Sequence, residues 1–465
     1  MKGAIYNSFS KLYNLTPLPN LDINYFIVLK ELIDIEKIQY YTRQELDKYQ
    51  DYKLRKLIKH VYNNVRFYKN WFRENNLQIN DFKGVKDLEK LPILTKPIIK
   101  ENFNDFISIK SGQYNPKLLM TTGSTGLPFR FFVDRIAKLK ENASIWRQWR
   151  LYNVKFRDRR AILRGTLVDE HGTKNRALWK YSFENKSLHL NTFHMNEENC
   201  IKIINKIFEY KPGIFQVYPM ALFILAQYIK KYDVNLSFLK MVHFSSEGYT
   251  QIHREFIKKQ FTCPILDRYG QSEIVLNAYE CKPENGYHVE EENNILEVLD
   301  KNFKQVSEGE TGRIVGTNLH NYSMPLIRYS TEDLAVMGGN ECSCRRHSKK
   351  LKSIQGRVLD QIITEDKSLI SGISFYHYWK HRISEKIPNL SFVQIIQPKI
   401  DEIIVRIFPT KLFSKKDEFL IIQELNKFVG NLDISFEYIN EKPFGEKWRF
   451  TISKISDTEI KSLLK

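Results

Sequence analysis

The chain is 465 residues long, about three times the size of a typical domain, which predicts two or three domains with a large buried core. Hydrophobic residues make up 42% and charged residues 27% of the chain, a composition that excludes a disordered or collagen-like protein. The net charge is +18, but Lys and Arg are spread along the chain without a basic tail. We therefore expect a solvated surface and no nucleic-acid partner.

Membrane and export signals are absent from the sequence. No stretch reaches the ~18 uninterrupted apolar residues of a membrane span, and the nearest one, 214–229, is broken by Gln216, Pro219 and Gln227. The N-terminal residues MKGAIYNSFSKLYN lack the apolar core of a signal peptide. The 5 cysteines are too sparse for a disulfide framework and fit a reducing compartment. We expect a cytoplasmic protein with no transmembrane segment.

The N-terminal part, residues 1–116, is predicted to be helical. Its clearest signal is an apolar series at helix spacing, formed by Leu54, Leu57, Ile58, Val61 and Val65. Such a series predicts the packing face of a helix.

From residue 117 the pattern changes to short apolar runs that alternate with amphipathic segments such as 198–210 and 221–231. This alternation predicts α/β layers. The run 241–244, followed by a helical pattern over 251–260, predicts a strand–loop–helix unit. Loops that follow strands are where α/β proteins place their sites.

Strand signals dominate from residue 294 onward, in the runs ILEVL, GRIVGT and LAVMG. A boundary between two domains is predicted at 353–356. Beyond it, two strand patterns and one helical pattern, over 391–396, 402–408 and 416–429, predict a small α+β domain. We therefore predict a large domain over 1–355 and a small C-terminal domain over 356–465.

The most informative segment is MTTGSTGLP at 120–128, where glycines alternate with hydroxyl residues. Glycines let backbone amides approach closely, and amides and hydroxyls together can surround phosphate oxygens. The spacing differs from that of the Walker P-loop, and by itself the segment also fits a flexible polar loop. We interpret it as a phosphate-binding loop whose members are Thr121, Thr122, Gly123, Ser124, Thr125 and Gly126.

This segment is the first of six motifs that resemble, in their order, those of the adenylate-forming ligase superfamily. In particular the chain resembles the phenylacetate-CoA ligase-like branch, which includes the CapK-type proteins of capsular polysaccharide biosynthesis. The later motifs are SSEG at 245–248, YGQSE at 269–273, RYSTED at 328–333, IQGRVLD at 354–360 and GEKWRF at 445–450. Upstream, LEKLPILTKPIIKENF is similar to the Leu-Pro-x-Leu-Thr-Lys signature of that branch. The resemblance covers nearly the whole chain and implies a large α/β adenylation domain with a smaller, mobile α+β lid domain.

The resemblance implies that several motif residues bind ATP and Mg²⁺. The ring of Tyr269 would face the adenine, and the carboxylate of Asp333 would accept hydrogen bonds from both ribose hydroxyls. Ser272 would donate to the α-phosphate, and Glu273 would hold Mg²⁺, a hard cation that prefers oxygen ligands. An ordinary turn at the end of a strand is the alternative interpretation of this motif. The other residues implied at the nucleotide are Gly270 and the loop Ser246, Glu247 and Gly248.

The last two motifs imply two further catalytic residues. Arg357 would pair with ribose or phosphate oxygens where the two domains meet. Lys447 would be the lysine that the small domain brings in to bridge the substrate carboxylate and the α-phosphate. The chain departs from the family pattern in three places, at Glu332 where glycine is usual, at the hinge residue Leu359, and at Glu446, where the motif usually reads Ser-Gly-Lys.

Cysteine and histidine residues form a second constellation. Residues two apart on an extended chain point the same way, so Cys342 and Cys344 could share a metal ion. Cys281 and His288 would complete a tetrahedral shell, which is typical of a closed structural zinc site. The family branch is similar in often carrying such a set. The alternatives are reduced buried thiols with a solvated His288, or His347 as a substitute ligand.

We therefore expect an ATP-dependent ligase that joins a small carboxylic acid to AMP with release of pyrophosphate and then transfers it to a thiol, with CoA as a candidate acceptor. Two alternatives stay open. One is transfer to an amine, without CoA, in surface polysaccharide biosynthesis, and the other is a catalytically silent nucleotide-binding protein. The acid pocket is expected between residues 164 and 246, where Tyr218 and Phe244 either line an apolar slot or pack in the core.

Overall fold

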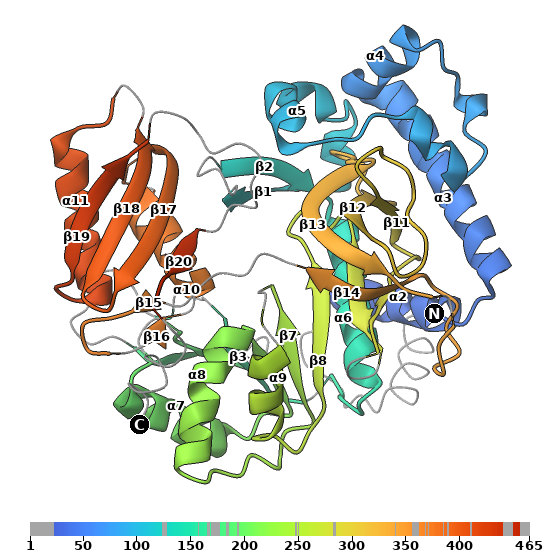
Figure 1. The fold of residues 1–465 in the computed structure, drawn as a ribbon. Coiled ribbons are helices and arrows are strands. Elements are labelled where there is room, and N and C mark those ends of the chain that lie inside the picture. Colours follow the sequence, from blue (N-terminus) through green and yellow to red (C-terminus); the bar gives the residue numbers. More distant parts are fainter. Residues whose placement is uncertain are drawn as a thin grey trace. The chain divides into compact units, whose positions relative to one another are not determined.

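The computed structural model describes residues 23–122, 128–156, 158–164, 168, 177–182, 186–192, 195–246, 249, 251–281, 285–339, 341–355, 362–367, 369–370, 372–384, 386–387, 390–409, 412–439 and 450–455. The chain divides into two compact units, and Figure 1 labels many of their helices and strands. The first comprises Met1–Thr121, Phe129–Phe156 and Leu266–Gln355, and the second comprises Thr122–Pro128, Arg157–Ile265 and Gly356–Lys465. Helices and strands alternate through much of the chain, so the predicted α/β class is confirmed.

The first unit begins with the predicted helices. The longest of its described helices is α3, Arg43–Asn64, which begins at a capping box because the Thr42 side chain accepts from the Glu45 amide while the Glu45 carboxylate accepts from the Thr42 amide. Its predicted apolar face is buried in a core that also contains Tyr68 and Phe72. The other helices of this unit are α2 (Ile23–Ile38), α4 (Arg66–Glu74), α5 (Lys96–Glu101) and α6 (Arg135–Arg150), with short 3₁₀ turns at Ile79–Asp81, Val85–Lys90, Phe103–Phe106 and Ser111–Tyr114.

Antiparallel strands form much of the rest of the first unit. They follow the order β11-β12-β13-β14-β10-β9-β8. Their bounds are β8 (Ile265–Gly270), β9 (Asn277–Glu280), β10 (Tyr287–Val289), β11 (Asn294–Leu299), β12 (Thr311–Asn318), β13 (Tyr329–Met337) and β14 (Lys350–Gln355). A separate hairpin consists of β1 (Lys117–Thr122) and β2 (Pro128–Val133). Residues 353–355 pair with β13 as the end of β14, and the chain passes from the first unit to the second between Gln355 and Gly356, within the predicted range 353–356.

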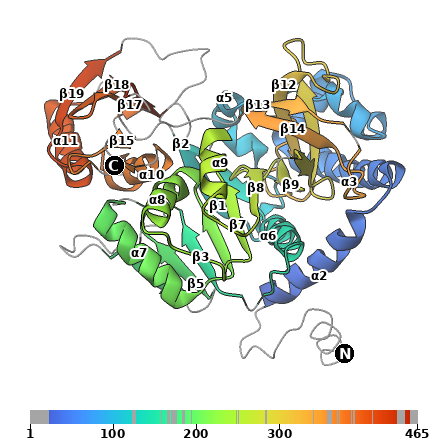
Figure 2. The ribbon, with the colours of Figure 1, turned by 60° about the horizontal axis from the view of Figure 1, so that its bottom comes forward.

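The second unit contains a mainly parallel sheet in the order β7-β6-β3-β5-β4. Its strands are β3 (Arg160–Leu163), β4 (Trp179–Ser182), β5 (Ser187–Leu190), β6 (Ile214–Val217) and β7 (Met241–Ser245), and only β4 runs antiparallel to its neighbour. Helices α7 (Glu197–Tyr210), α8 (Pro219–Lys231) and α9 (Gln251–Lys258) pack on it (Figure 2). The predicted strand–loop–helix unit at 241–260 is confirmed. Because β3, β6 and β7 are parallel, their carboxyl ends lie at one edge.

The C-terminal residues of the second unit form a separate sheet in the order β19-β18-β17-β20. The strands of this sheet are β17 (Leu390–Lys399), β18 (Glu402–Pro409), β19 (Asp433–Tyr438) and β20 (Thr451–Ser453). The same part of the chain contains a two-stranded pair, β15 (Ile362–Ile363) with β16 (Leu369–Ile370), the helices α10 (Gly372–Tyr378) and α11 (Lys415–Val429), and the π-helical turn Trp379–Ser384. Alternate residues of β17 and β18 pack against α11 in an apolar core. This arrangement confirms the predicted α+β character of the segment. Among the described residues, no helix has the length and apolar character that a membrane crossing requires.

Candidate functional site

Tyr269 and Asp333 come from motifs far apart in the sequence and are in direct contact. Tyr269 lies near the end of β8, and its hydroxyl donates to Asp333 Oδ2, on β13, at 2.8 Å. Burial, together with the negative charge of Asp333, raises the pKa of Tyr269 well above its usual value. The phenol therefore stays protonated and keeps the carboxylate in one orientation. The two residues expected at the adenine and the ribose are thus brought together.

The residue before Asp333 is Glu332, which stands where glycine is usual in this motif. Glu332 has a φ of +66°, which is the left-handed conformation that glycine adopts without strain. Glu332 therefore holds a conformation that is strained for a residue with a side chain. The Glu332 carboxylate pairs with Lys96 Nζ at 3.1 Å, and the Asp333 amide donates to Thr331 Oγ1 at 3.2 Å.

The Leu-Pro-x-Leu-Thr-Lys signature has a structural role that sequence reasoning missed. The Leu94 amide donates to the Arg328 carbonyl, and the Ser330 amide donates to the Leu94 carbonyl, each at 2.9 Å. The signature thus docks on the start of β13 and brings Lys96 to Glu332. The signature and the RYSTED motif occur together in one family, and this was the signal from which the contact between them could have been predicted.

The turn after β8 carries Ser272 and Glu273. Ser272 is exposed, whereas Glu273 is buried and accepts from the Tyr329 hydroxyl at Oε1, at 2.9 Å. A carboxylate has a second oxygen, and Mg²⁺ in nucleotide sites is often held by one or two carboxylates together with phosphates, so Glu273 fits the expected ion. The next residue, Ile274, has a φ of +49°, which is costly for a β-branched side chain. Such strain is typical of functional turns.

Gly270 lies directly against the side chain of Asn277. A Cβ placed on it would lie 2.6 Å from Asn277 Oδ1 on β9. The glycine expected beside the nucleotide is therefore also required by the packing between neighbouring strands.

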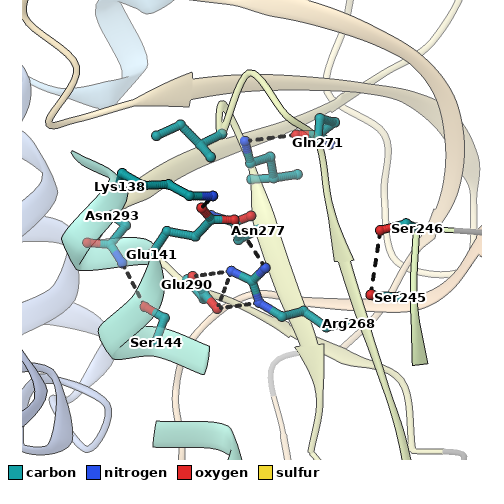
Figure 3. Close-up of polar contacts among 12 residues, drawn as sticks. Lys138, Glu141, Ser144, Ser245, Ser246, Arg268, Gln271, Asn277, Glu290 and Asn293 are labelled. Carbon is teal, nitrogen blue, oxygen red and sulfur yellow. Dashed lines mark hydrogen bonds and ion pairs between the residues drawn. The ribbon is translucent and has the colours of Figure 1, made fainter. Parts of the chain in front are cut away.

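Ser246 follows β7 in the second unit and has a φ of +71°. Its hydroxyl accepts from Arg164 Nη2 at 2.9 Å, and the same nitrogen also donates to Ser245. The guanidinium of Arg164 lies over the ring of Tyr218, with 5.5 Å between its Cζ and the ring centroid. Figure 3 shows the two serine hydroxyls facing each other at the end of the strand. Arg164 begins the range 164–246 in which the acid pocket is expected, and of the two residues named there both Tyr218 and Phe244 are buried in the core.

Cys281, His288, Cys342 and Cys344 form one cluster in the first unit, and their ligand atoms all lie within 4.8 Å of one another. The two sulfur atoms of Cys281 and Cys342 are 3.9 Å apart, and Cys344 Sγ is 3.3 Å from His288 Nε2. A tetrahedral zinc shell has edges of about 3.6 to 3.8 Å, so the donor set fits this ion. His288 Nδ1 bonds to the Ser348 hydroxyl at 2.9 Å, which orients the ring. His347 is exposed and is not part of this cluster.

Comparison with known proteins supports the resemblance drawn from the motifs. Residues 362–454 match the model of the CapK C-terminal domain. Protein CapK of Staphylococcus aureus is 25% identical over 422 residues, which cover 88% of this chain and 90% of that protein. The phenylacetate-coenzyme A ligase of Thermus thermophilus is 22% identical, over 80% of this chain and 84% of that protein. The chain resembles the CapK and phenylacetate-CoA ligase branch.

The fold agrees with this CapK-type resemblance. The structure of 2-hydroxyisobutyryl-CoA ligase in complex with 2-HIB-AMP and CoA superposes with a TM-score of 0.61 at 17% identity. The match covers 90% of this chain and 91% of that chain. The chain therefore has the α/β fold of adenylate-forming ligases, as predicted.

Several predicted site residues lie outside the described part of the chain. Of Thr121 and Thr122 only the backbone is described, in β1. The others are Gly123, Ser124, Thr125, Gly126, Glu247, Gly248, Arg357 and Lys447, together with the departures Leu359 and Glu446. Their roles stay predictions.

A buried ionic network around Arg268 supports β8 (Figure 3). Successive residues of a strand point to opposite faces, so Arg268 and Tyr269 face apart. Arg268 pairs with Glu290 and with Glu141 on α6, each at 3.4 Å. The Lys138 ammonium and Arg268 lower the pKa of Glu141 in spite of its burial, which by itself would raise the pKa. Sequence reasoning missed this network, because its members are separated by many residues.

Proposed function

We propose that the chain is an ATP-dependent ligase that activates a carboxylic acid as acyl-AMP and passes the acyl group to a thiol such as that of CoA. In the first step a carboxylate oxygen attacks the α-phosphorus of ATP, and the bond to the β-phosphate bridging oxygen breaks to release pyrophosphate. In the second step the thiol sulfur attacks the acyl carbon, loses its proton, and displaces AMP. The observation that carries the proposal is the contact of Tyr269 with Asp333.

The residues of the first unit suit the nucleotide part of this reaction. Asp333, oriented by Tyr269, offers carboxylate oxygens to the ribose hydroxyls. The exposed hydroxyl of Ser272 is available to the α-phosphate, and the buried carboxylate of Glu273 would hold Mg²⁺. Bound Mg²⁺ would neutralise charge on the phosphates.

The C-terminal residues would act as a lid. We retain the division into a large domain over 1–355 and a small domain over 356–465 as part of the proposal. The lid would bring Lys447 to the carboxylate and the α-phosphate in the first step, and Arg357 would pair with ribose or phosphate oxygens. Positioning and charge neutralisation of this kind supply most of the catalysis in phosphoryl and acyl activation.

The cysteine cluster would have a structural role. We propose that Cys281, His288, Cys342 and Cys344 hold one zinc ion, because four protein ligands leave no open position for substrate. The ion would join the loop before β14 to the turn between β9 and β10.

A panel of carboxylic acids in pyrophosphate exchange tests the activity. Acid-dependent exchange is expected for the wild type, and Asp333→Ala should raise the KM for ATP by about tenfold or more, since a hydrogen bond to a charged group contributes about 1.5–3 kcal/mol. The matched control is the variant Asp47→Ala. Asp47 is a surface carboxylate of α3 that pairs with Arg43.

The outcomes separate the three candidate functions. Thioester formation with CoA supports the main proposal, and amide formation without CoA supports the amine ligase. A silent panel with tight binding of AMP in calorimetry would replace both by a nucleotide-binding protein without catalysis.

A further inference from the structure

Arg346 lies directly beside the cysteine cluster of the first unit, in the loop that leads from Cys344 to β14. The Arg345 amide donates to the Cys342 carbonyl at 3.1 Å, and Arg345 has a φ of +64°, so the chain makes a tight turn at these two cysteines. Nη1 of Arg346 donates to Cys281 Sγ at 3.6 Å. The turn therefore places a cation against a sulfur atom of the cluster.

The guanidinium of Arg346 is buried and is held in one orientation. The residue is 4% exposed, and its Nε donates to Gln39 Oε1 at 3.0 Å. Its Cζ lies 5.5 Å from the centroid of the Tyr40 ring and 5.9 Å from that of the Tyr279 ring. The Gln39 amide group donates in turn to the Glu36 carbonyl at 3.0 Å, which orients the Gln39 side chain. These contacts come from the end of α2 and from β9, and they leave the guanidinium facing the sulfur atom.

The cysteine cluster can compensate the charge of this buried cation. A buried ion costs free energy unless it is paired and hydrogen-bonded. Among the contacts of Arg346 with described residues, the Gln39 amide and the two tyrosine rings are neutral, whereas a cysteine can lose its proton. A cluster of neutral thiols would therefore leave the guanidinium with an uncompensated charge in the interior, and metal-bound thiolates would remove this cost.

The charge of a zinc site built from this cluster would balance that of Arg346. Three thiolates and one neutral imidazole around Zn²⁺ carry one negative charge in total. The guanidinium carries one positive charge, which arginine keeps throughout the physiological pH range. A hydrogen bond from a cation to a thiolate is also stronger than one between neutral groups. Arg346 would thus stabilise the cluster with its metal more than the cluster without it.

We propose that Arg346 is a positioning residue of the metal site, which orients the Cys281 thiolate through its hydrogen bond and compensates the negative charge of the zinc complex. The inference rests on the zinc site of the proposed function and adds to it a residue that is not one of the four ligands. Groups that bond to metal ligands in this way typically change the metal affinity by about 10–100-fold.

Competition with a chromophoric zinc chelator measures the affinity of the full chain for zinc. Arg346→Met keeps the length of the side chain but removes its charge and its N–H donors, and it should weaken zinc binding by about tenfold or more. Arg346→Lys keeps the charge and should restore part of the affinity. The matched control is Arg345→Met, since Arg345 is exposed, carries the same charge and lies in the same turn. This control should leave the affinity unchanged.

Substitution of zinc by Co²⁺ distinguishes a direct contact with the sulfur from a merely structural role. Cobalt bound to cysteine absorbs light by charge transfer from the thiolate, and a hydrogen bond to the sulfur lowers the energy of its lone pairs. Loss of this bond in Arg346→Met should therefore shift the absorption band to longer wavelength, and Arg345→Met should leave the band in place. If Arg346→Met fails to fold by circular dichroism, Gln39→Leu replaces it. That variant removes the acceptor that orients Nε, and it should change the affinity and the band in the same directions by smaller amounts.

Each result has a defined meaning for the inference. Unchanged zinc affinity and an unchanged cobalt band in the test variant overturn the role of Arg346 and leave the zinc site intact. A loss of affinity without a shift of the band indicates a structural residue and also overturns the inference. Wild-type protein that binds neither zinc nor cobalt overturns the inference together with the zinc site. Pyrophosphate exchange is measured separately, so a chain that is silent in exchange but shows both effects of Arg346→Met overturns the ligase alone.

Discussion

His320 is a buried histidine that the fold holds in its neutral form. Its Nε2–H donates to the Glu292 carbonyl at 3.0 Å, and its backbone amide donates to Asn318 Oδ1 at 2.7 Å. Burial lowers its pKa to about 3, and the positive charges of Lys140 and Lys53 act in the same direction. The imidazole therefore takes up no proton in the folded protein at mildly acidic pH.

This pKa shift predicts a loss of stability in acid. The unfolded chain binds a proton at His320 below about pH 6.5, whereas the folded chain does so only near pH 3, so the free energy of unfolding falls as the pH falls between these values. At about pH 5 the expected loss from this residue is about 2 kcal/mol, at about 1.4 kcal/mol per pKa unit. Urea unfolding at pH 7 and pH 5 should show a smaller difference in His320→Gln than in the wild type. An equal difference in the two proteins would contradict the assignment.

At the scale of elements, the cysteine cluster joins three neighbouring strands. Cys281 follows β9, His288 lies on β10, and Cys342 and Cys344 precede β14. Strand β10 pairs with β9 on one side and with β14 on the other, which brings the ends of the three strands to one place. A metal ion here would add a further connection to a loop that already bonds to Gln39 through Arg346 and to Arg43 through the His347 carbonyl.

We predict about one zinc ion per chain in protein purified without added metal, measured by elemental analysis. Cys342→Ser should lose the metal and lower the unfolding temperature, because a structural zinc site contributes free energy of folding. Cys263→Ser is the matched control, since Cys263 is a half-buried thiol of the second unit outside the cluster. Zinc-free protein with unchanged stability in Cys342→Ser would indicate reduced thiols without a metal.

At the scale of the whole molecule, the proposed lid predicts that the two half-reactions depend differently on Lys447. Negative charge increases between the carboxylate and the α-phosphate during adenylation, and an ammonium group there lowers the barrier. Lys447→Ala should slow adenylation by about 10²-fold or more, while transfer from a pre-formed acyl-adenylate should stay nearly intact. Single-turnover rates of each step on one variant measure the difference.

The control for this experiment is the variant Lys454→Ala. Lys454 is exposed and lies just beyond β20 in the same C-terminal segment. This variant should affect neither step. Equal losses in both steps for Lys447→Ala would mean that this lysine is structural. No loss in either would mean that Glu446 marks a shifted motif and that another residue performs the task.

The spacing of apolar residues predicts correctly those helices and strands whose pattern lies within one short segment of the chain. The spacing of apolar residues predicts a helix over 416–429, and α11 spans Lys415–Val429. The run 402–408 predicts a strand, and β18 spans Glu402–Pro409 with alternating burial. Cross-strand pairing with β13 carries β14 to Gln355, and the boundary between the two units follows directly after it, within the predicted range 353–356.

The sequence by itself determined the α/β class, the order of the six motifs and the four residues of the cysteine cluster, because each depends on residue type and spacing along the chain. Only the tertiary structure decided which residues meet. Lys96 pairs with Glu332, which is 236 positions away, and Arg164 reaches Ser246, which is 82 positions away. The first contact arises because Leu94 docks on the start of β13, and the second arises because β3, β6 and β7 are parallel and end at one edge of a sheet. No local pattern of hydrophobicity encodes that geometry.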